Sequence, residues 1–263
     1  MTERSRSDSQ AGTRVDYGSG LRQYGELWMP EGRPTLASGR YPVVVAVHGG
    51  FWRNPFRLDL MDPMAEVLVG DGLAVWNIEY RSVGDPGGGY PGTLHDVATA
   101  FDRLVDLAEE HSLDLGRVVV VGHSAGGHLA LWLAGRDRLD HGWPGSAPQL
   151  MPLAVVAQAP VVDLAAAFVS GMGSNAVAEF MGGGPTELPE EYATATPVLN
   201  AAISAIVHGT DDDRVPLDHV LAAVEPSGTP VTIVDGADHF EVITPGTAAF
   251  GEVRRLVELA VRS

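Results

Sequence analysis

The sequence predicts a single α/β domain built on a doubly wound, mostly parallel sheet. Short β-branched runs alternate with longer segments of helical periodicity, and several of the runs are apolar almost throughout. Parallel strands that are covered by helices on both faces have this continuous apolar character. A chain of 263 residues is long enough to bury a sizeable core in one such domain.

Short runs rich in valine and isoleucine, bounded by turn residues, are predicted to be the parallel strands. These runs are 43–47, 73–79, 117–122, 153–157, 203–208 and 230–234. Near the start, residues 13–17 and 24–29 flank Gly18 and Gly20. We expect them to form an antiparallel hairpin at the edge of the sheet.

Apolar residues at helical spacing predict the helices between these strands. The predicted helices are 57–69, 94–110, 125–135 and 246–261. Residues 163–199 contain no clear strand and much glycine and proline, so we expect an insertion that acts as a lid or pocket wall. Residues 1–14 are polar and are expected to be a flexible tail, which leaves 15–263 as the single domain.

Composition excludes several kinds of chemistry. Cysteine is absent and all 17 basic residues are arginine, so a cysteine nucleophile, a zinc–thiolate site and any site that needs a lysine amine are excluded. With 34 acidic residues the net charge is −17, which disfavours nucleic acid or an anionic membrane as a partner. The N-terminus is no secretory signal and the apolar runs are too short to span a membrane, so a soluble, cytoplasmic protein is expected.

A G-x-S-x-G motif at residues 122–126 follows a predicted strand and precedes a predicted helix. In this context Ser124 is the candidate nucleophile, because a sharp strand-to-helix turn projects its hydroxyl from the sheet. Gly122 and Gly126 fit the motif because side chains there would collide with neighbouring elements. The alternative is a glycine-rich turn in which Ser124 only caps the helix.

The general base and its acidic partner are expected after later strands, on the same edge of the sheet as the serine. His239 is the candidate base. Asp211, Asp212 and Asp213 are the candidates for the acid, and Asp212 is favoured because it lies three residues before Val215. Three adjacent carboxylates could instead hold a divalent cation.

An oxyanion hole is predicted in the loop after the first parallel strand, where a glycine pair allows backbone amides to approach a substrate closely. The expected donors are the N–H groups of Gly50, Phe51 and Ala125. A simple glycine turn is the alternative. Three other histidines near these loops are expected to hold loops in place rather than to carry out chemistry: His48, His123 and His128.

Four motifs together resemble the α/β-hydrolase superfamily, and within it the small esterases that include the arylformamidase (kynurenine formamidase) proteins. They are HGGFW, GHSAGG, HGTDDDRVP and GADHF. The resemblance runs from about Val15 to the C-terminal helix and implies the α/β-hydrolase fold, with Ser124, Asp212 and His239 as the triad. Glu79 stands where relatives have the aspartate of a D-Y-R segment.

A serine hydrolase that cleaves small carboxylic esters is the leading function, with no cofactor and as a monomer or homodimer. An arylformamidase that acts on N-formylkynurenine-like formamides uses the same triad and remains an alternative. A non-enzymatic ligand-binding protein of the same fold is a third, although such proteins usually lose the base.

Trp52, Tyr80 and Phe240 are expected either to line the substrate pocket or to pack in the core. Arg53 and Arg81 either meet a substrate carboxylate or pair with acidic residues.

Overall fold

The computed structural model describes residues 12–34 and 36–262. An eight-stranded sheet runs in the order β1-β2-β4-β3-β5-β6-β7-β8, and all pairings from β4 to β8 along this order are parallel. The strands are β1 (Thr13–Asp16), β2 (Tyr24–Trp28), β3 (Tyr41–Val47), β4 (Ala74–Ile78), β5 (Leu113–His123), β6 (Ala154–Gln158), β7 (Ser204–Gly209) and β8 (Val231–Val234). The sheet confirms the predicted α/β-hydrolase fold.

The predicted edge hairpin is present. β1 pairs with β2, and β2 pairs with β4, in both cases antiparallel. Thr13 and Arg14, which the sequence assigned to the tail, lie in β1, while residues 1–11 of that tail are outside the described residues.

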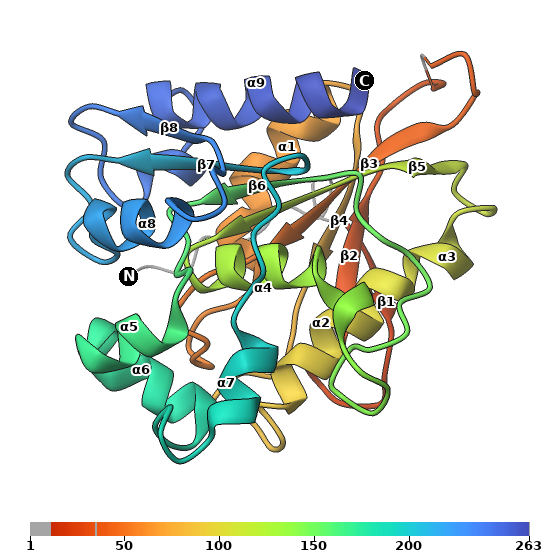
Figure 1. Cartoon of the computed structure of the whole chain (residues 1–263). Helices are drawn as coiled ribbons and strands as arrows, with labels where there is room; N and C mark the ends of the chain where they lie inside the picture. The colour runs from red at the N-terminus through yellow and green to blue at the C-terminus, as the bar shows by residue number, and fades with distance from the viewer. Residues whose placement is uncertain (1–11, 35, 263) are drawn as a thin grey trace.

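Helices cover both faces of the sheet (Figure 1). The helices are α1 (Asp62–Gly70), α2 (Gly92–Asp102), α3 (Leu104–Leu107), α4 (Ala125–Leu133), α5 (Leu164–Val169), α6 (Met172–Met181), α7 (Pro189–Ala195), α8 (Leu217–Val224) and α9 (Ala248–Arg262), with short 3₁₀ turns η1 (Leu58–Met61), η2 (Arg136–Arg138) and η3 (Glu241–Ile243). α1 and α9 pack on one face, and α2, α4 and α8 on the other. Alternate residues of β3 enter the two cores: Val43 and Val45 on the α4 side, Val44 and Ala46 on the α1 side.

Two predicted helices are divided in the structure. The segment predicted as 57–69 begins with the 3₁₀ turn η1, and α1 starts at Asp62 with Pro63 in its first turn. Proline favours this position because it has no N–H to donate to a preceding turn. The segment predicted as 94–110 becomes α2 and α3, separated by Arg103, whose backbone angles remain helical.

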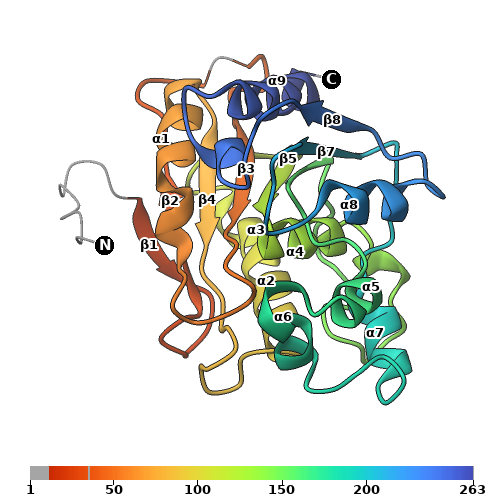
Figure 2. The ribbon, with the colours of Figure 1, turned by 90° about the vertical axis from the view of Figure 1, so that its left-hand side faces the viewer.

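The insertion at 163–199 is helical. It forms α5, α6 and α7, which lie side by side on the α4 side of the sheet (Figure 2). Left-handed residues interrupt it at Gly171, Gly173, Ser174 and Asn175. Apolar residues of the insertion, including Phe180, join the core beneath it.

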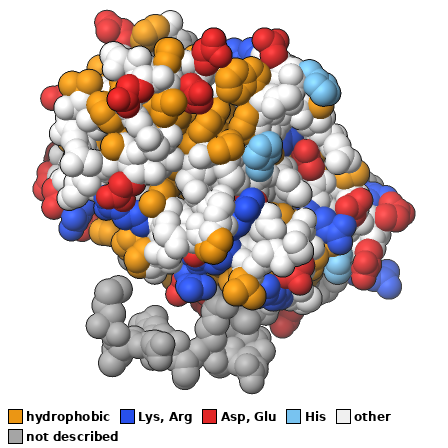
Figure 3. Space-filling view, turned by 90° about the horizontal axis from the view of Figure 1, so that it is seen from below, with side chains coloured by type: hydrophobic (Ala, Val, Ile, Leu, Met, Phe, Trp, Pro, Cys, Tyr) orange, Lys and Arg blue, Asp and Glu red, His pale blue; other side chains and the backbone are white. Residues whose placement is uncertain are grey.

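Acidic and arginine side chains are interspersed with apolar ones on the face seen from below (Figure 3). Among the described residues, none of the helices is both long and apolar enough to cross a membrane.

Candidate active site

Ser124 occupies a strained turn between β5 and α4. Its φ and ψ are 57° and −118°, and its side chain caps none of the N–H groups of α4. This conformation differs from the extended backbone of an ordinary N-cap, and such strain gathers at functional sites. A Cβ on Gly122 would overlap the carbonyl oxygen of Gly126, and a Cβ on Gly126 would overlap those of Val47 and His48. These close approaches of backbone carbonyl oxygens therefore strongly favour glycine at both positions.

The loop that follows β3 lies directly against this turn. A Cβ on Gly49 would come within 3.0 Å of the Cβ of Ser124. Gly50, Phe51 and Trp52 have φ values of 110°, 53° and 55°, so three consecutive residues are left-handed. Within residues 12–34 and 36–262, the N–H groups of Gly50, Phe51 and Ala125 have no protein acceptor. Free amides beside a strained serine are the donors that an oxyanion requires.

Only one of the three candidate acids contacts His239. Asp212 is buried, and its Oδ2 lies 2.7 Å from Nδ1 of His239. Its Oδ1 accepts the backbone N–H groups of Arg214 at 2.9 Å and Val215 at 2.8 Å. Burial by itself would raise the pKa of Asp212, but the hydrogen bond and charge of His239 and the two backbone N–H groups outweigh it and hold the pKa below its ordinary value.

Asp211 and Asp213 are exposed and take no part in this pair. Asp213 lies 3.2 Å from Arg214, and Asp211 accepts from the hydroxyl of Thr210. In the described part of the chain, no group of three or more histidine, aspartate and glutamate side chains could hold a metal ion.

Two residues tie the His239 loop to the serine turn. His123 donates from Nε2 to the carbonyl oxygen of His239 at 2.9 Å, and the two rings lie 4.6 Å apart. Gln158 accepts the N–H of Ser124 at 2.8 Å through its backbone and donates from its side chain to Val242 at 2.6 Å. The sequence analysis missed Gln158, although a single polar residue at the end of an apolar buried strand was the available signal.

His123 and His128 are fully buried, and both hold loops. His128 donates from Nε2 to the carbonyl oxygen of Ala195 and accepts from the indole of Trp52 at 3.3 Å. Burial lowers the pKa of His123 to about 3 and that of His128 to about 4, because the charged ring would be desolvated. Both rings are therefore neutral at pH 7.

The imidazole of His208 also faces the carboxylate of Asp212. His208 lies at the end of β7, with its Nε2 3.6 Å from Oδ2 of Asp212 and without a hydrogen-bond partner. Its Nδ1 donates to the carbonyl oxygen of Gly209. Burial lowers the pKa of His208, so this ring too is neutral and presents a lone pair toward the carboxylate.

The three side chains expected at the pocket have different surroundings. Trp52 and Tyr80 are 1% and 0% exposed, whereas Phe240 is 49% exposed and its ring lies 5.3 Å from that of His239. Tyr80 stacks on His48, and its hydroxyl donates to the His48 carbonyl oxygen at 2.7 Å. Trp52 and Tyr80 are therefore packed in the interior at the loop that follows β3, and Phe240 alone of the three is exposed, beside His239.

Both candidate substrate-binding arginines have acidic partners. Arg81 pairs with Asp96 at 2.7 Å, and Arg53 pairs with Glu179 of the insertion at 2.7 Å. The Trp52 ring also stacks on Phe180 of the insertion, with 4.7 Å between ring centroids. The insertion thus packs directly on the loop that follows β3, which holds the candidate oxyanion donors Gly50 and Phe51.

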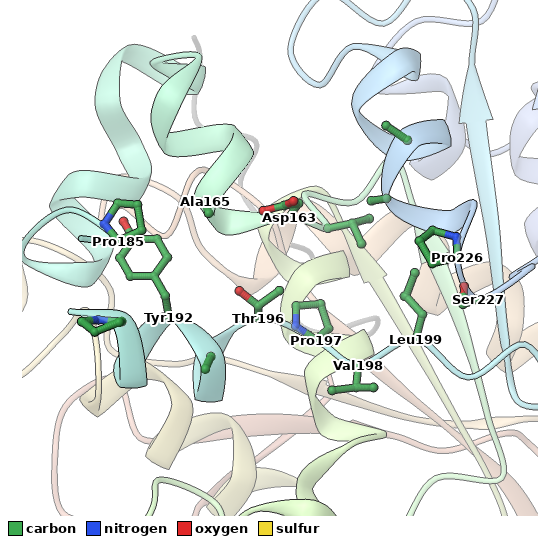
Figure 4. Close-up of a pocket in the computed structure, with 15 residues that line it drawn as sticks. Asp163, Ala165, Pro185, Tyr192, Thr196, Pro197, Val198, Leu199, Pro226 and Ser227 are labelled. Atoms are coloured by element: carbon green, nitrogen blue, oxygen red, sulfur yellow. The ribbon is translucent and has the colours of Figure 1, made fainter. Parts of the chain in front are cut away.

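A separate groove of about 870 Å³ runs between the insertion and α8 (Figure 4). In the close-up, Tyr192 and Pro185 form one side, and Pro226 and Ser227 the other. The insertion, which was expected to be a lid or pocket wall, supplies most of the lining, but the lining includes none of Ser124, Asp212, His239, Trp52, Tyr80 and Phe240. The groove is therefore distinct from the cluster around Ser124.

Two curated esterases match parts of this sequence. Carboxylesterase NlhH of Mycobacterium tuberculosis is 34% identical over 119 residues, which are 45% of this chain and 36% of that protein. Esterase LipC of the same organism is 26% identical over 226 residues, which cover 81% of this chain and 54% of LipC. The chain thus spans between about a third and a half of the length of these curated relatives.

Solved structures show the same fold. A truncated carbohydrate esterase from gut microbiota superposes with a TM-score of 0.79 at 19% identity, covering 98% of this chain and 99% of that one. Esterase B of Lactobacillus rhamnosis gives a TM-score of 0.76 at 20% identity, covering 95% and 85%. The BD-FAE family model matches residues 32–225, which include the oxyanion loop, the serine turn and Asp212. The chain therefore belongs to the BD-FAE family.

Proposed function

We propose that this protein is a serine hydrolase that cleaves small carboxylic esters through a covalent acyl-enzyme. The observation that carries the proposal is the buried Asp212–His239 pair, tied by His123 to the strained turn that holds Ser124. The matched relatives NlhH and LipC are described as a carboxylesterase and an esterase, which supports an ester as the substrate.

In the proposed mechanism each group has one role. Because His239 donates from Nδ1 to Asp212, its Nε2 carries a lone pair and accepts the proton of Ser124 as Oγ attacks the ester carbonyl carbon. The amides of Gly50, Phe51 and Ala125 stabilise the negative charge that develops on the carbonyl oxygen. His239 then returns the proton to the departing alkoxide, which leaves as the alcohol.

The second half of the reaction repeats these steps with water. His239 removes a proton from water, the hydroxide attacks the acyl carbon, and Ser124 leaves with the proton from His239 as the carboxylic acid is released. Phe240 is the exposed apolar side chain beside His239 and supplies a contact for an apolar part of the substrate.

The test is turnover of p-nitrophenyl acetate and butyrate by the wild type and by Ser124→Ala. Loss of the nucleophile is expected to lower kcat by a factor of about 10,000 or more. Ser170→Ala, on an exposed serine of the insertion, is the matched control and is expected to keep wild-type rates. Wild-type turnover in Ser124→Ala would contradict the proposal.

Two further measurements separate the alternatives. N-formylkynurenine in the same assay tests the arylformamidase, which uses the same triad on a formamide. Labelling by a fluorophosphonate, blocked in Ser124→Ala, tests the non-enzymatic binding protein, because only an activated serine reacts. A wild type that neither reacts with the label nor hydrolyses either ester would favour the binding protein.

A further inference from the structure

A buried glutamate lies beneath the oxyanion loop. Glu79 follows β4 and is 0% exposed. Its Oε1 lies 2.9 Å from Nε2 of His48, the residue before the glycine pair, and its Oε2 accepts the N–H of Leu58 at 3.2 Å. One carboxylate therefore holds the first residue of the loop between β3 and η1 and the first residue of η1 itself.

Arg22 holds the middle of the same loop. Its guanidinium lies 3.2 Å from Oε2 of Glu79 and donates to the backbone carbonyl oxygens of Asn54 at 2.9 Å and Phe56 at 3.3 Å. Asp85 accepts from its Nε at 3.0 Å. Glu79 and Arg22 together contact the loop at His48, Asn54 and Phe56, and η1 at Leu58.

The imidazole of His48 has a defined orientation. Nδ1 of His48 lies 2.8 Å from the carbonyl oxygen of Gly49, while Nε2 faces Glu79. The ring stacks on Tyr80 at 4.2 Å and 7° between planes. This cage fixes the peptide that leads into the left-handed residues Gly50 and Phe51, and left-handed backbone at a non-glycine residue persists only where its surroundings hold it.

We propose that Glu79 is a positioning residue for ester hydrolysis, fixing the oxyanion amides of Gly50 and Phe51 through its contacts with His48 and Leu58. The inference rests on the proposed function, because it assigns a role within the same site. Glu79 lies beneath the loop and acts on the transition state through the loop backbone. Burial by itself would raise the pKa of Glu79, but the charge and hydrogen bond of His48 and the charge of Arg22 lower it by more. The net pKa lies below its ordinary value, so the carboxylate is ionised at neutral pH.

The test is Glu79→Gln. Glutamine keeps the shape but replaces one acceptor oxygen with an NH₂ donor. If its oxygen stays on Leu58, its NH₂ faces both Nε2 of His48 and the backbone N–H of Tyr80, so the Tyr80 N–H loses its acceptor and His48 can only accept a hydrogen bond at Nε2. The backbone amides of Gly50 and Phe51 are then displaced but still present. Because a displaced donor stabilises the oxyanion less well, we expect kcat for p-nitrophenyl butyrate to fall about 10- to 100-fold, with KM changed less than about 3-fold. The affinity of a boronic acid, whose adduct with Ser124 places an oxygen among these amides, is expected to fall by a similar factor.

Asp102→Asn is the matched control. Asp102 pairs with the fully buried Arg136 at 2.7 Å, and neither residue contacts the oxyanion loop. This variant also leaves a buried arginine without its anionic partner, so it lowers the melting temperature but keeps kcat below that temperature. A loss of kcat confined to Glu79→Gln therefore distinguishes positioning from general destabilisation.

Tyr80→Phe provides a milder second variant should Glu79→Gln fail to fold. It removes the hydroxyl that donates to the His48 carbonyl oxygen, and a fall in kcat of about 3- to 10-fold at unchanged KM is expected. Wild-type kcat in a folded Glu79→Gln, or in Tyr80→Phe where the first is unfolded, overturns the inference. Absence of turnover in the wild type itself would instead overturn the proposed function.

Discussion

Replacing Asp212 by asparagine is expected to reverse the tautomer of His239. In the structure Asp212 Oδ1 accepts two backbone N–H groups, while Oδ2 faces Nδ1 of His239 at 2.7 Å and Nε2 of His208 at 3.6 Å. An asparagine that keeps its oxygen on the two N–H groups presents its NH₂ to both histidines. His208 Nε2, which has no partner, can accept one of these hydrogens. His239 must then accept the other at Nδ1 and carry its own proton on Nε2.

The opposite orientation of the amide is disfavoured. Turning the asparagine to accept from His239 would place its NH₂ against the N–H groups of Arg214 and Val215. Each buried donor without an acceptor costs about 1–3 kcal/mol, so this orientation lies roughly 2–6 kcal/mol higher. His239 with a proton on Nε2 cannot accept the serine proton. We expect kcat to fall by a factor of about 10,000, which corresponds to about 5 kcal/mol in the activation free energy.

The assay is the steady-state hydrolysis of p-nitrophenyl acetate at pH 7, with circular dichroism to establish that the variant is folded. Asp213→Asn is the control, because Asp213 is exposed and contacts only Arg214; its kcat is expected within 2-fold of wild type, about the change that an exposed ion pair produces. A folded Asp212→Asn that loses less than 10-fold would refute the tautomer argument.

Two further predictions concern stability. Because burial lowers the pKa values of His123 and His128, the unfolded chain binds more protons than the folded one below about pH 6.5. The contribution of these neutral rings to the free energy of unfolding is therefore fully present above that pH. It falls toward pH 4 by up to about 1.4 kcal/mol per pH unit for each ring. Urea unfolding at pH 7.5, 6.0 and 5.0 measures the slope, and an equal slope in His128→Gln would show that this ring does not contribute. Gly126→Ala is expected to cost about 1–3 kcal/mol because its Cβ overlaps the carbonyl oxygen of His48, and to lower kcat by moving the oxyanion loop. Gly251→Ala lies in α9, where a Cβ meets open space, and is expected to stabilise the folded protein by about 0.5–1 kcal/mol. Equal thermal stability of Gly126→Ala and Gly251→Ala would count against the steric argument.

Local pattern was sufficient for the sheet and for the position of the serine. The runs before Gly49, Gly122 and Gly209 are parallel strands that helices cover on both faces. Such strands consist almost entirely of apolar residues, so they can be recognised from the sequence. The contact of Asp212 with His239 was suggested by register and resemblance, but its two neighbouring carboxylates have the same chemistry. Only the burial of Asp212 and its two backbone donors distinguish it.

Residues whose roles depend on tertiary contacts were harder to recognise in the sequence. Glu79 and Arg22 are 57 positions apart in the sequence. The sequence marked Glu79 only as a replacement for the aspartate of a D-Y-R segment, and neither residue showed its contact with the other or with the loop after β3. The helices of the insertion were missed for a related reason. Gly171 and Gly173 interrupt helical periodicity, while residues such as Phe180 are held by packing on the rest of the protein.

The order of the functional elements along the chain has a consequence for synthesis. Ser124 and the oxyanion loop lie on β5 and after β3, whereas His239 follows β8, the last strand. In the proposed mechanism, a growing chain therefore contains its nucleophile and its oxyanion donors before it contains the base, His239. Under the proposed function, this triad can hydrolyse no ester until His239 has been added after β8 and β8 has paired with β7, so hydrolysis would report the completion of the sheet.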